Sequence, residues 1–130
     1  MATIKSYSDL QQSKKLEEIL PLESADMYYP NRTDVRYQGA LPIEFKLGNP
    51  LLSQESACWS LAALLNIIPQ EIFDGEYIIN ITEGCDNRWV LTYDHYENRN
   101  HSYYGLSSGA DNLIDACYEM IIKLRDLNLL

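Results

Sequence analysis

The sequence predicts an α+β fold in which helices pack on a small antiparallel β-sheet, either a hairpin or a meander of three to four strands. Two observations predict this class. Apolar residues recur at helical spacing in three segments, and two runs of β-branched and aromatic residues lie between the second and the third of them. The expected order is therefore helix, loop, helix, two or three strands, and a final helix.

The first expected element is a helix close to the N-terminus. Ser8–Gln11 has the form of a capping box, and Asp9 suits the positive end of a helix dipole. The helix should run to about Leu20, because Pro21 follows. Its apolar edge is narrow, which predicts that the helix docks on a larger body rather than organising one.

A second helix is expected to begin near Ser56, whose hydroxyl can cap it, and to continue until Pro69 ends it. Its residues are apolar almost all round, including Cys58, Trp59 and Leu64. A helix without a wide polar face is normally enclosed by other elements. This segment is therefore the best candidate for the centre of the core.

A turn and two strands come next. Asp74-Gly75 predicts a tight turn that leads into a strand over residues 77–82. Residues 88–95 alternate apolar and polar side chains, apart from Val90, and predict a strand with one buried face. The two strands should form an antiparallel hairpin, and a further short strand is expected near Tyr103-Tyr104.

The last helix has the clearest pattern. Its apolar residues repeat at helical spacing, while acidic residues and Lys123 occupy the other face. Full burial of a Leu or Ile side chain contributes ~1.5 to 3 kcal/mol, so this stripe should supply a large part of the core. Its five defining positions are Leu113, Cys117, Met120, Ile121 and Leu124.

These elements suit a single domain over residues 1–130. The composition, 46% hydrophobic and 22% charged, is that of an ordinary globular chain. A chain of this length buries roughly two thirds of its unfolded surface, which is enough for a core without metals or disulfides. The expected parts are a docking helix, an irregular crossing segment and a helix-strand-strand-helix core, at 1–21, 22–55 and 56–130.

The net charge of −9 bears on the choice of partner. Residues 1–65 hold 8 acidic and 6 basic side chains, whereas residues 66–130 hold 11 acidic and 4 basic ones. Nucleic acids are normally bound by clustered Lys and Arg, so this balance argues against them and favours a basic partner.

The expected location is the cytoplasm. No stretch approaches the ~18 apolar residues of a membrane span, and no signal-type run opens the chain. The three cysteines are odd in number and form no C-x-x-C pair, which predicts reduced thiols. We expect no cofactor, because the phosphate-loop and hydrolase motifs are missing. The leucines at the C-terminal end leave both a monomer and a homodimer open.

Three segments carry a resemblance: IKSYSDLQQSKKL at 4–16 with the following residues 23–28, CWSLAALLNIIP at 58–69, and IDACYEMIIKLRDLNLL at 114–130. Together they resemble a group of short uncharacterised proteins encoded by gut anaerobic bacteria and by their phages and mobile elements. The resemblance implies a gene context rather than an activity. It carries no catalytic residues over to this chain.

One enzymatic alternative rests on Ser56–Ser60. This segment is similar to the nucleophile segment of papain-like cysteine peptidases, with Cys58 as the nucleophile and His95 as the base. The glycine and the second cysteine of that signature are missing, and a cysteine among Trp and Leu is typically a small core residue. We therefore assign no catalytic residue and keep the cysteine hydrolase as an alternative.

A second alternative is a small metal-binding or ligand-binding domain. Asp94, His95, Glu97 and His101 would offer oxygen and imidazole ligands within one loop, a mixture that suits Zn²⁺ or a similar ion. A polar loop after a strand contains such residues anyway, and the spacing matches no metal motif. We therefore assign no metal site.

The ten tyrosines of the chain favour a recognition surface. Tyrosine combines a large apolar area with a polar tip, and several tyrosines gather around the acidic hairpin and loop. The leading hypothesis is a non-enzymatic accessory protein that binds an unknown protein partner, and the resemblance implies a phage or mobile-element context. Its predicted binding surface consists of Tyr93, Asp94, Tyr96, Glu97, Tyr103 and Tyr104.

Overall fold

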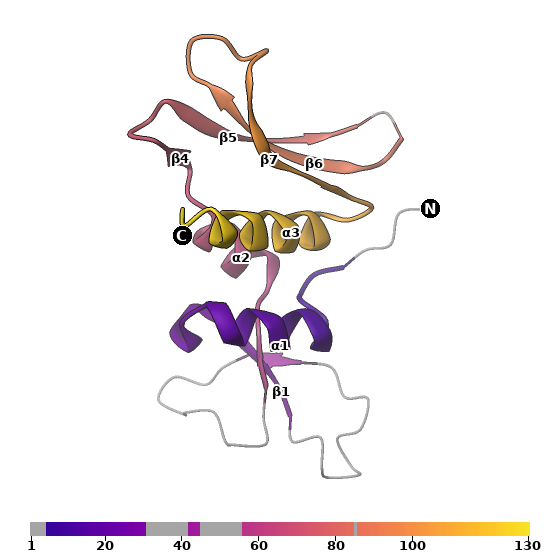
Figure 1. Ribbon diagram of the computed structural model, residues 1–130. Coiled ribbons are helices and arrows are strands. Elements are labelled where there is room, and N and C mark those ends of the chain that lie inside the picture. Colours follow the sequence, from indigo (N-terminus) through magenta and orange to yellow (C-terminus); the bar gives the residue numbers. More distant parts are fainter. Residues whose placement is uncertain (1–4, 31–41, 45–55, 85) are drawn as a thin grey trace. The chain divides into compact units, whose positions relative to one another are not determined.

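The computed structural model shows an α+β fold, as the sequence predicts (Figure 1). It describes residues 5–30, 42–44, 56–84 and 86–130. The chain divides into two compact units. The N-terminal unit is Ser6–Ala63, and the C-terminal unit joins Met1–Lys5 to Leu64–Leu130. The single domain over 1–130 stays a prediction.

The first helix of the N-terminal unit is α1, Leu10–Ile19. It begins with a capping box in which the Asp9 carboxylate accepts from the Gln12 backbone N–H at 2.8 Å and the Asp9 N–H donates to Gln12 Oε1 at 3.0 Å. The N-cap is thus Asp9, one residue later than the predicted Ser8. The helix stops before Pro21, as expected, and a short 3₁₀ turn, η1, follows at Leu22–Ser24.

A three-stranded antiparallel sheet completes the N-terminal unit. Its strands are β1, Met27–Tyr29, β2, Ile43–Glu44, and β3, Ser56–Cys58, in the spatial order β2-β1-β3. Two corrections follow. The segment predicted to be irregular contributes two strands, and the predicted start of the second helix is a strand paired with β1.

The second helix, α2, spans Leu61–Ile67, so it begins later than predicted but ends before Pro69 as expected. Its first turn is capped by Ser60, whose Oγ accepts from the Ala63 N–H at 3.2 Å. Ser60 is fixed in turn by Asp26, which accepts from both the backbone N–H, at 2.9 Å, and the hydroxyl of Ser60. The boundary between the two units falls inside this helix, after Ala63.

The C-terminal unit contains a four-stranded antiparallel meander in the order β4-β5-β6-β7. The predicted hairpin is confirmed, with Ile79 opposite Tyr93. The strand near Tyr103-Tyr104 is longer than expected, and a two-residue strand before the Asp74-Gly75 turn was not predicted. The four strands are β4, Glu71–Ile72, β5, Tyr77–Glu83, β6, Trp89–His95, and β7, Ser102–Ala110.

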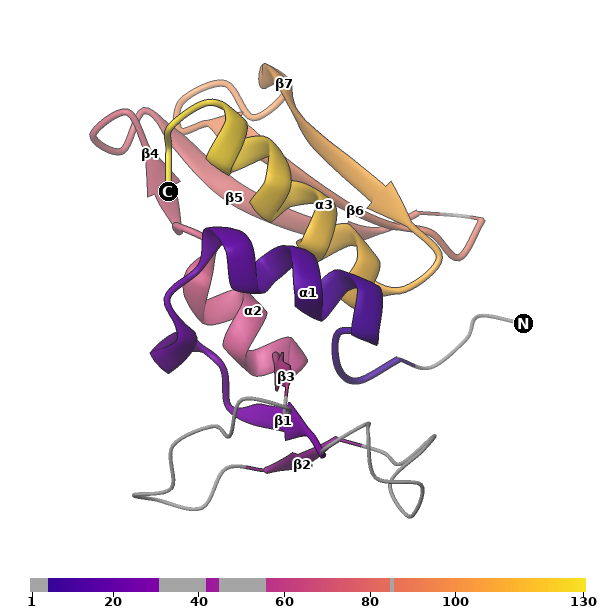
Figure 2. The same ribbon diagram turned by 60° about the horizontal axis from the view of Figure 1, so that its bottom comes forward.

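Helix α3, Leu113–Asp126, covers one face of this meander (Figures 1 and 2). Asn112 caps its start, and the Ser108 hydroxyl on β7 donates to the Ala116 carbonyl at 2.8 Å. Leu113, predicted in the apolar stripe, is only half-buried, whereas the rest of the stripe is confirmed. The buried residues of the helix are Ile114, Ala116, Cys117, Met120, Ile121 and Leu124.

The end of α3 is a Schellman motif. The Leu129 N–H donates to the Leu124 carbonyl at 2.8 Å, and the Asn128 N–H donates to the Arg125 carbonyl at 3.1 Å. Asn128 adopts the left-handed φ of 58° that the motif requires. Across the described residues, no helix combines the length and the apolar character needed to cross a membrane.

Candidate functional site

Six aromatic rings of the C-terminal unit form a continuous cluster, called the ring cluster below. Phe73 lies 5.0 Å from Tyr103, and Tyr103 lies 5.2 Å from Tyr77, measured between ring centroids. Tyr77 in turn lies 5.5 Å from His95, which stacks on the next ring at 4.9 Å. The cluster consists of Phe73, Tyr77, His95, Tyr96, His101 and Tyr103.

The turn between β4 and β5 positions the first ring of the cluster. Phe73, Asp74 and Gly75 all have positive φ, at 52°, 56° and 88°, and the Glu76 N–H closes the turn on the Phe73 carbonyl at 3.2 Å. Positive φ at both central residues matches the Asp-Gly turn that the sequence predicts. A bulky residue such as Phe73 adopts this conformation only at a cost in free energy, so neighbouring contacts must hold it there.

The loop between β6 and β7 positions the ring at the other end. The Tyr96 N–H donates to the Glu76 carbonyl at 3.0 Å, and the His95 N–H donates to the His101 carbonyl at 2.9 Å. His95 Nδ1 accepts from the backbone N–H groups of Glu97, at 3.2 Å, and Asn98, at 3.4 Å. These bonds place the proton of a neutral His95 on Nε2, which lies 3.9 Å from Glu76 Oε1.

Exposed carboxylates lie close in sequence to Phe73 and Tyr96, the two exposed large hydrophobic rings of the cluster. Phe73 is 43% exposed and Tyr96 is 53% exposed. Asp74 and Glu76 lie in the turn of Phe73, and Glu97 accepts from the Tyr96 hydroxyl at 3.0 Å. The side chains of all three acids are exposed, and Arg99 is the basic residue of the same loop. The surface is therefore aromatic and mainly acidic.

The predicted binding surface is only partly at the surface. Tyr96 and Glu97 are exposed, and Tyr103 is half-buried within the ring cluster. Tyr93 is a correction, because it is fully buried and its hydroxyl donates to the Pro69 carbonyl at 2.6 Å. Burial also raises the pKa of the Tyr93 hydroxyl. The side chain of Tyr104 lies outside the described residues.

Asp94 is a second correction to the predicted surface. It is buried, and its carboxylate accepts from the Asn80 amide at 3.0 Å and from the Ser102 hydroxyl at 2.7 Å. Conversely, Phe73 and Tyr77 belong to the ring cluster although they were not among the predicted site residues. The sequence could have indicated their membership, because Phe73 and Tyr77 lie on either side of the Asp74-Gly75 turn and a tight turn brings its flanking side chains together.

The residues considered for a metal do not converge on one point. Both oxygens of Asp94 and the Nδ1 atom of His95 are engaged in the hydrogen bonds given above. His101 packs its ring 6.4 Å from that of His95. Within 5–30, 42–44, 56–84 and 86–130, no group of three or more His, Cys, Asp or Glu side chains is placed to hold a metal ion.

Cys58 is buried in the N-terminal unit. Its Sγ donates to the Ser8 carbonyl at 3.4 Å, and burial raises the pKa of the thiol above its ordinary value. A neutral, inaccessible thiol is a poor nucleophile. His95 belongs to the other unit, and the cysteine hydrolase remains an untested prediction. Cys117 is buried as well, and Cys85 lies outside the described residues.

Comparison of the chain with family models, with curated proteins and with solved structures gives no match. The resemblance to short proteins of gut bacteria and their phages therefore stays a prediction.

Proposed function

We propose that this protein is a non-enzymatic binding protein whose ring cluster contacts a basic segment of another protein. The observation that carries the proposal is the pair of exposed rings, Phe73 and Tyr96, at the ends of one connected cluster with carboxylates beside them. An Arg or Lys side chain over the face of an exposed ring gains about 0.5 to 1 kcal/mol, and a neighbouring carboxylate adds charge attraction.

The rigidity of the two loops supports this proposal. The left-handed turn fixes Phe73, and backbone hydrogen bonds to Glu76 and His101 fix the loop that carries Tyr96. A ring that is already held in place loses little conformational entropy when a partner binds. Strained backbone conformations such as that of Phe73 are also more common at functional sites than elsewhere.

The charge of the chain supports a basic partner. The segment 66–130 holds 11 acidic and 4 basic side chains, so it attracts positively charged molecules over a distance set by the salt concentration. An accessory role, in which the protein modulates a host factor, fits this charge and the resemblance to phage and mobile-element proteins. The buried state of Cys58 favours such a role over hydrolysis.

The test uses labelled peptides of equal length that are rich in Arg, rich in Lys, or neutral, and measures binding by fluorescence anisotropy. We expect the Arg-rich peptide to bind most tightly, because guanidinium groups stack best on rings. The double variant Phe73→Ala with Tyr96→Ala should weaken its binding roughly 5- to 30-fold, since two ring contacts are lost.

The matched control is Leu22→Ala, which removes an exposed apolar side chain from the N-terminal unit and should leave binding unchanged. Thermal melts of all variants check that the fold is retained. Equal affinity of the double variant and the wild type, or the same affinity for neutral and basic peptides, would contradict the proposal.

A further inference from the structure

One edge of the four-stranded sheet is left open along the second half of β5. Strand β4 pairs only with Tyr77 and Ile78, and the last bond on this side runs from the Ile79 N–H to the Gln70 carbonyl at 2.9 Å. Backbone groups of alternate residues face the same edge of a strand. The N–H and C=O groups of Ile81 and Glu83 therefore face the side of β4, beyond its end, and no described residue pairs with them there.

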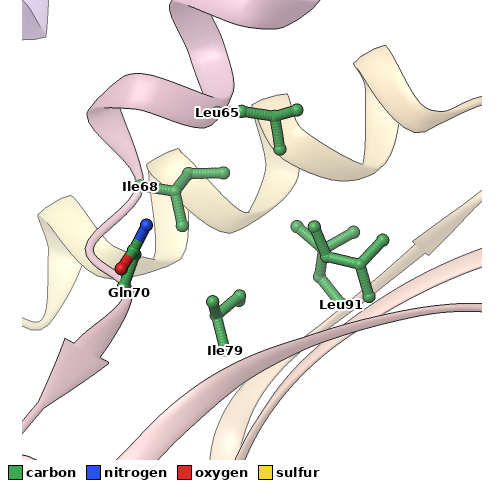
Figure 3. A pocket seen from close by; sticks show the side chains of 6 residues that line it. Leu65, Ile68, Gln70, Ile79 and Leu91 are labelled. Carbon is green, nitrogen blue, oxygen red and sulfur yellow. The ribbon is translucent and has the colours of Figure 1, made fainter.

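An apolar hollow lies beside this open edge (Figure 3). It measures about 170 Å³, and its lining combines five aliphatic side chains with one amide. An aliphatic cavity of about 150 Å³ holds a molecule the size of benzene, so the hollow has room for one aliphatic or aromatic side chain. The lining residues are Leu65, Ile68, Gln70, Ile79, Ile81 and Leu91.

The hollow and the open edge share a residue. Ile81 contributes its side chain to the hollow and its backbone groups to the edge, and it is 37% exposed although it is a large aliphatic residue. A strand placed along Ile81–Glu83 would project alternate side chains toward the face of the sheet on which the hollow lies. Backbone pairing and side-chain insertion would therefore occur together.

We propose that the open edge of β5 binds an extended segment of another protein as an added strand, with one aliphatic side chain in the hollow and basic residues beside it. Peptide recognition by strand addition has this form: the backbone bonds give affinity, and a pocket for an alternate side chain gives specificity. The proposal is independent of the ring cluster, because Tyr77 and Ile81–Glu83 lie at opposite ends of β5.

Charge decides between a foreign segment and a second copy of this chain. Glu83 ends the open edge, and Asp86 follows in the next turn. Arg88, the basic residue of this turn region, instead donates to the Gly109 carbonyl on β7 at 3.0 Å. A second copy paired along the same edge would bring a second Glu83 to it, and like charges across a strand pair are destabilising. A segment with Arg or Lys beside its aliphatic residue would instead complement the edge.

The other edge of the sheet shows how an edge is protected. On β7, the Lys123 ammonium group of α3 donates to the Ser107 carbonyl. Lysine at a sheet edge is a common means of blocking further strand pairing. Among the described residues, no Lys or Arg makes a corresponding bond to Ile81 or Glu83.

The probe is a labelled peptide that alternates Ile and Thr between terminal Arg residues. The control peptide has the same flanks but carries Pro at the central position, which removes a backbone donor. Binding is measured by anisotropy, and its location by amide NMR shifts and hydrogen exchange. We expect the amides of Ile81 and Glu83 to shift and gain protection, and the Pro peptide to bind about tenfold more weakly.

Two variants make the test specific. Ile81→Lys places a positive charge in the hollow's rim and should weaken binding about tenfold, whereas Leu127→Lys, a matched change of an exposed leucine on the same unit, should leave it unchanged. The proposal is overturned if the peptide shifts only amides of the ring cluster, or if the Pro peptide binds as tightly as the probe. It is also overturned if no binding occurs at millimolar peptide, or if the edge amides are protected by self-association without peptide.

Discussion

Ser8 connects its own segment to three others of the N-terminal unit, α1, β1 and β3 with Trp59, through hydrogen bonds. Its Oγ lies 2.7 Å from Ser13 Oγ on α1 and accepts from the Trp59 N–H at 3.1 Å. Its carbonyl accepts from the Tyr29 hydroxyl at 2.7 Å and from the thiol of Cys58. Because Ser8 is completely buried, each of these groups depends on it rather than on water.

Replacing Ser8 by Ala should therefore destabilise the protein. The substitution leaves the Trp59 N–H buried without its acceptor, which costs about 1 to 3 kcal/mol. Urea unfolding measures the loss. The control is Ser6→Ala, an exposed serine in the same segment, which should change the free energy of unfolding by less than about 0.5 kcal/mol. Equal stability of the two variants would disprove the role assigned to Ser8.

Cys117 should make stability depend on pH in the alkaline range. Burial raises the pKa of its thiol from 9.0 to about 12. Between these values the unfolded chain releases the proton while the folded protein keeps it, so the free energy of unfolding falls as pH rises. The total loss in the free energy of unfolding is on the order of 4 kcal/mol and is complete only above the pKa of the folded thiol. Below the pKa of the unfolded thiol there is no such loss.

The measurement compares wild type with Cys117→Ala by urea unfolding under reducing conditions, from about pH 8 to about pH 10.5. The variant should be less stable at the lower pH, and the difference should narrow as pH rises. Leu91→Ala is the control, because it truncates a buried side chain without an ionisable group and its difference from wild type should stay constant. A constant difference for Cys117→Ala would rule out this linkage.

At the scale of elements, the end of α3 gives a clear prediction. Asn128 has a φ of 58°, and a left-handed conformation costs an L-residue other than Gly or Asn roughly 1 to 2 kcal/mol. Asn128→Val should therefore lower the free energy of unfolding by about this amount, whereas Asn128→Gly should preserve or raise it.

Chemical denaturation of the two variants checks this prediction. Asn100→Val, a change at an exposed loop position without positive φ, provides the control and should have little effect. If Asn128→Val were as stable as Asn128→Gly, the helix would not end in the Schellman motif described above.

In the C-terminal unit, the elements that the sequence predicts correctly are those with a long repeat. Helix α3 and strands β5 and β6 carry seven or more residues of regular pattern, and their types and pairing are confirmed. Strands of two or three residues, such as β2 and β3, show no period. Their backbone bonds come from partners far along the chain, which no local pattern can indicate.

The start of the second helix also depends on contacts that the local sequence does not show. The sequence predicts a start near Ser56, whose hydroxyl can cap a helix, but the structure places the cap at Ser60. The pairing of Ser56–Cys58 with β1 and the bonds from Ser60 to Asp26 select the later one. Both determinants are contacts between distant segments.

The predicted binding surface and the ring cluster share Tyr96 and Tyr103 but differ in their other members. Tyr96 and Glu97 are exposed as expected, whereas Tyr93 is buried. The alternation along β6 places Tyr93 with Leu91 on the inner face and indicates a buried ring. The number of tyrosines near the loop does not distinguish buried rings from exposed ones. Phe73 enters the site only through the fold of its turn.

The net charge is unevenly distributed between the two units of the chain. The acidic excess of residues 66–130 coincides with the unit that carries both proposed binding surfaces, so salt should weaken binding at each of them by screening the same charges.

The N-terminal unit is one continuous stretch, whereas the C-terminal unit joins Met1–Lys5 to a later part of the chain. Lys5 makes that link with a 2.8 Å ion pair to Asp115 on α3.

The position of α3 after every strand has a consequence on the ribosome. The inner face of the meander, with Leu91, Tyr93 and Leu106, acquires its cover only when residues 113–126 have been made. Translation at ~5–20 residues per second leaves this face bare for about one to three seconds after β7. While it is uncovered, the apolar inner face of the sheet is open to non-native contacts.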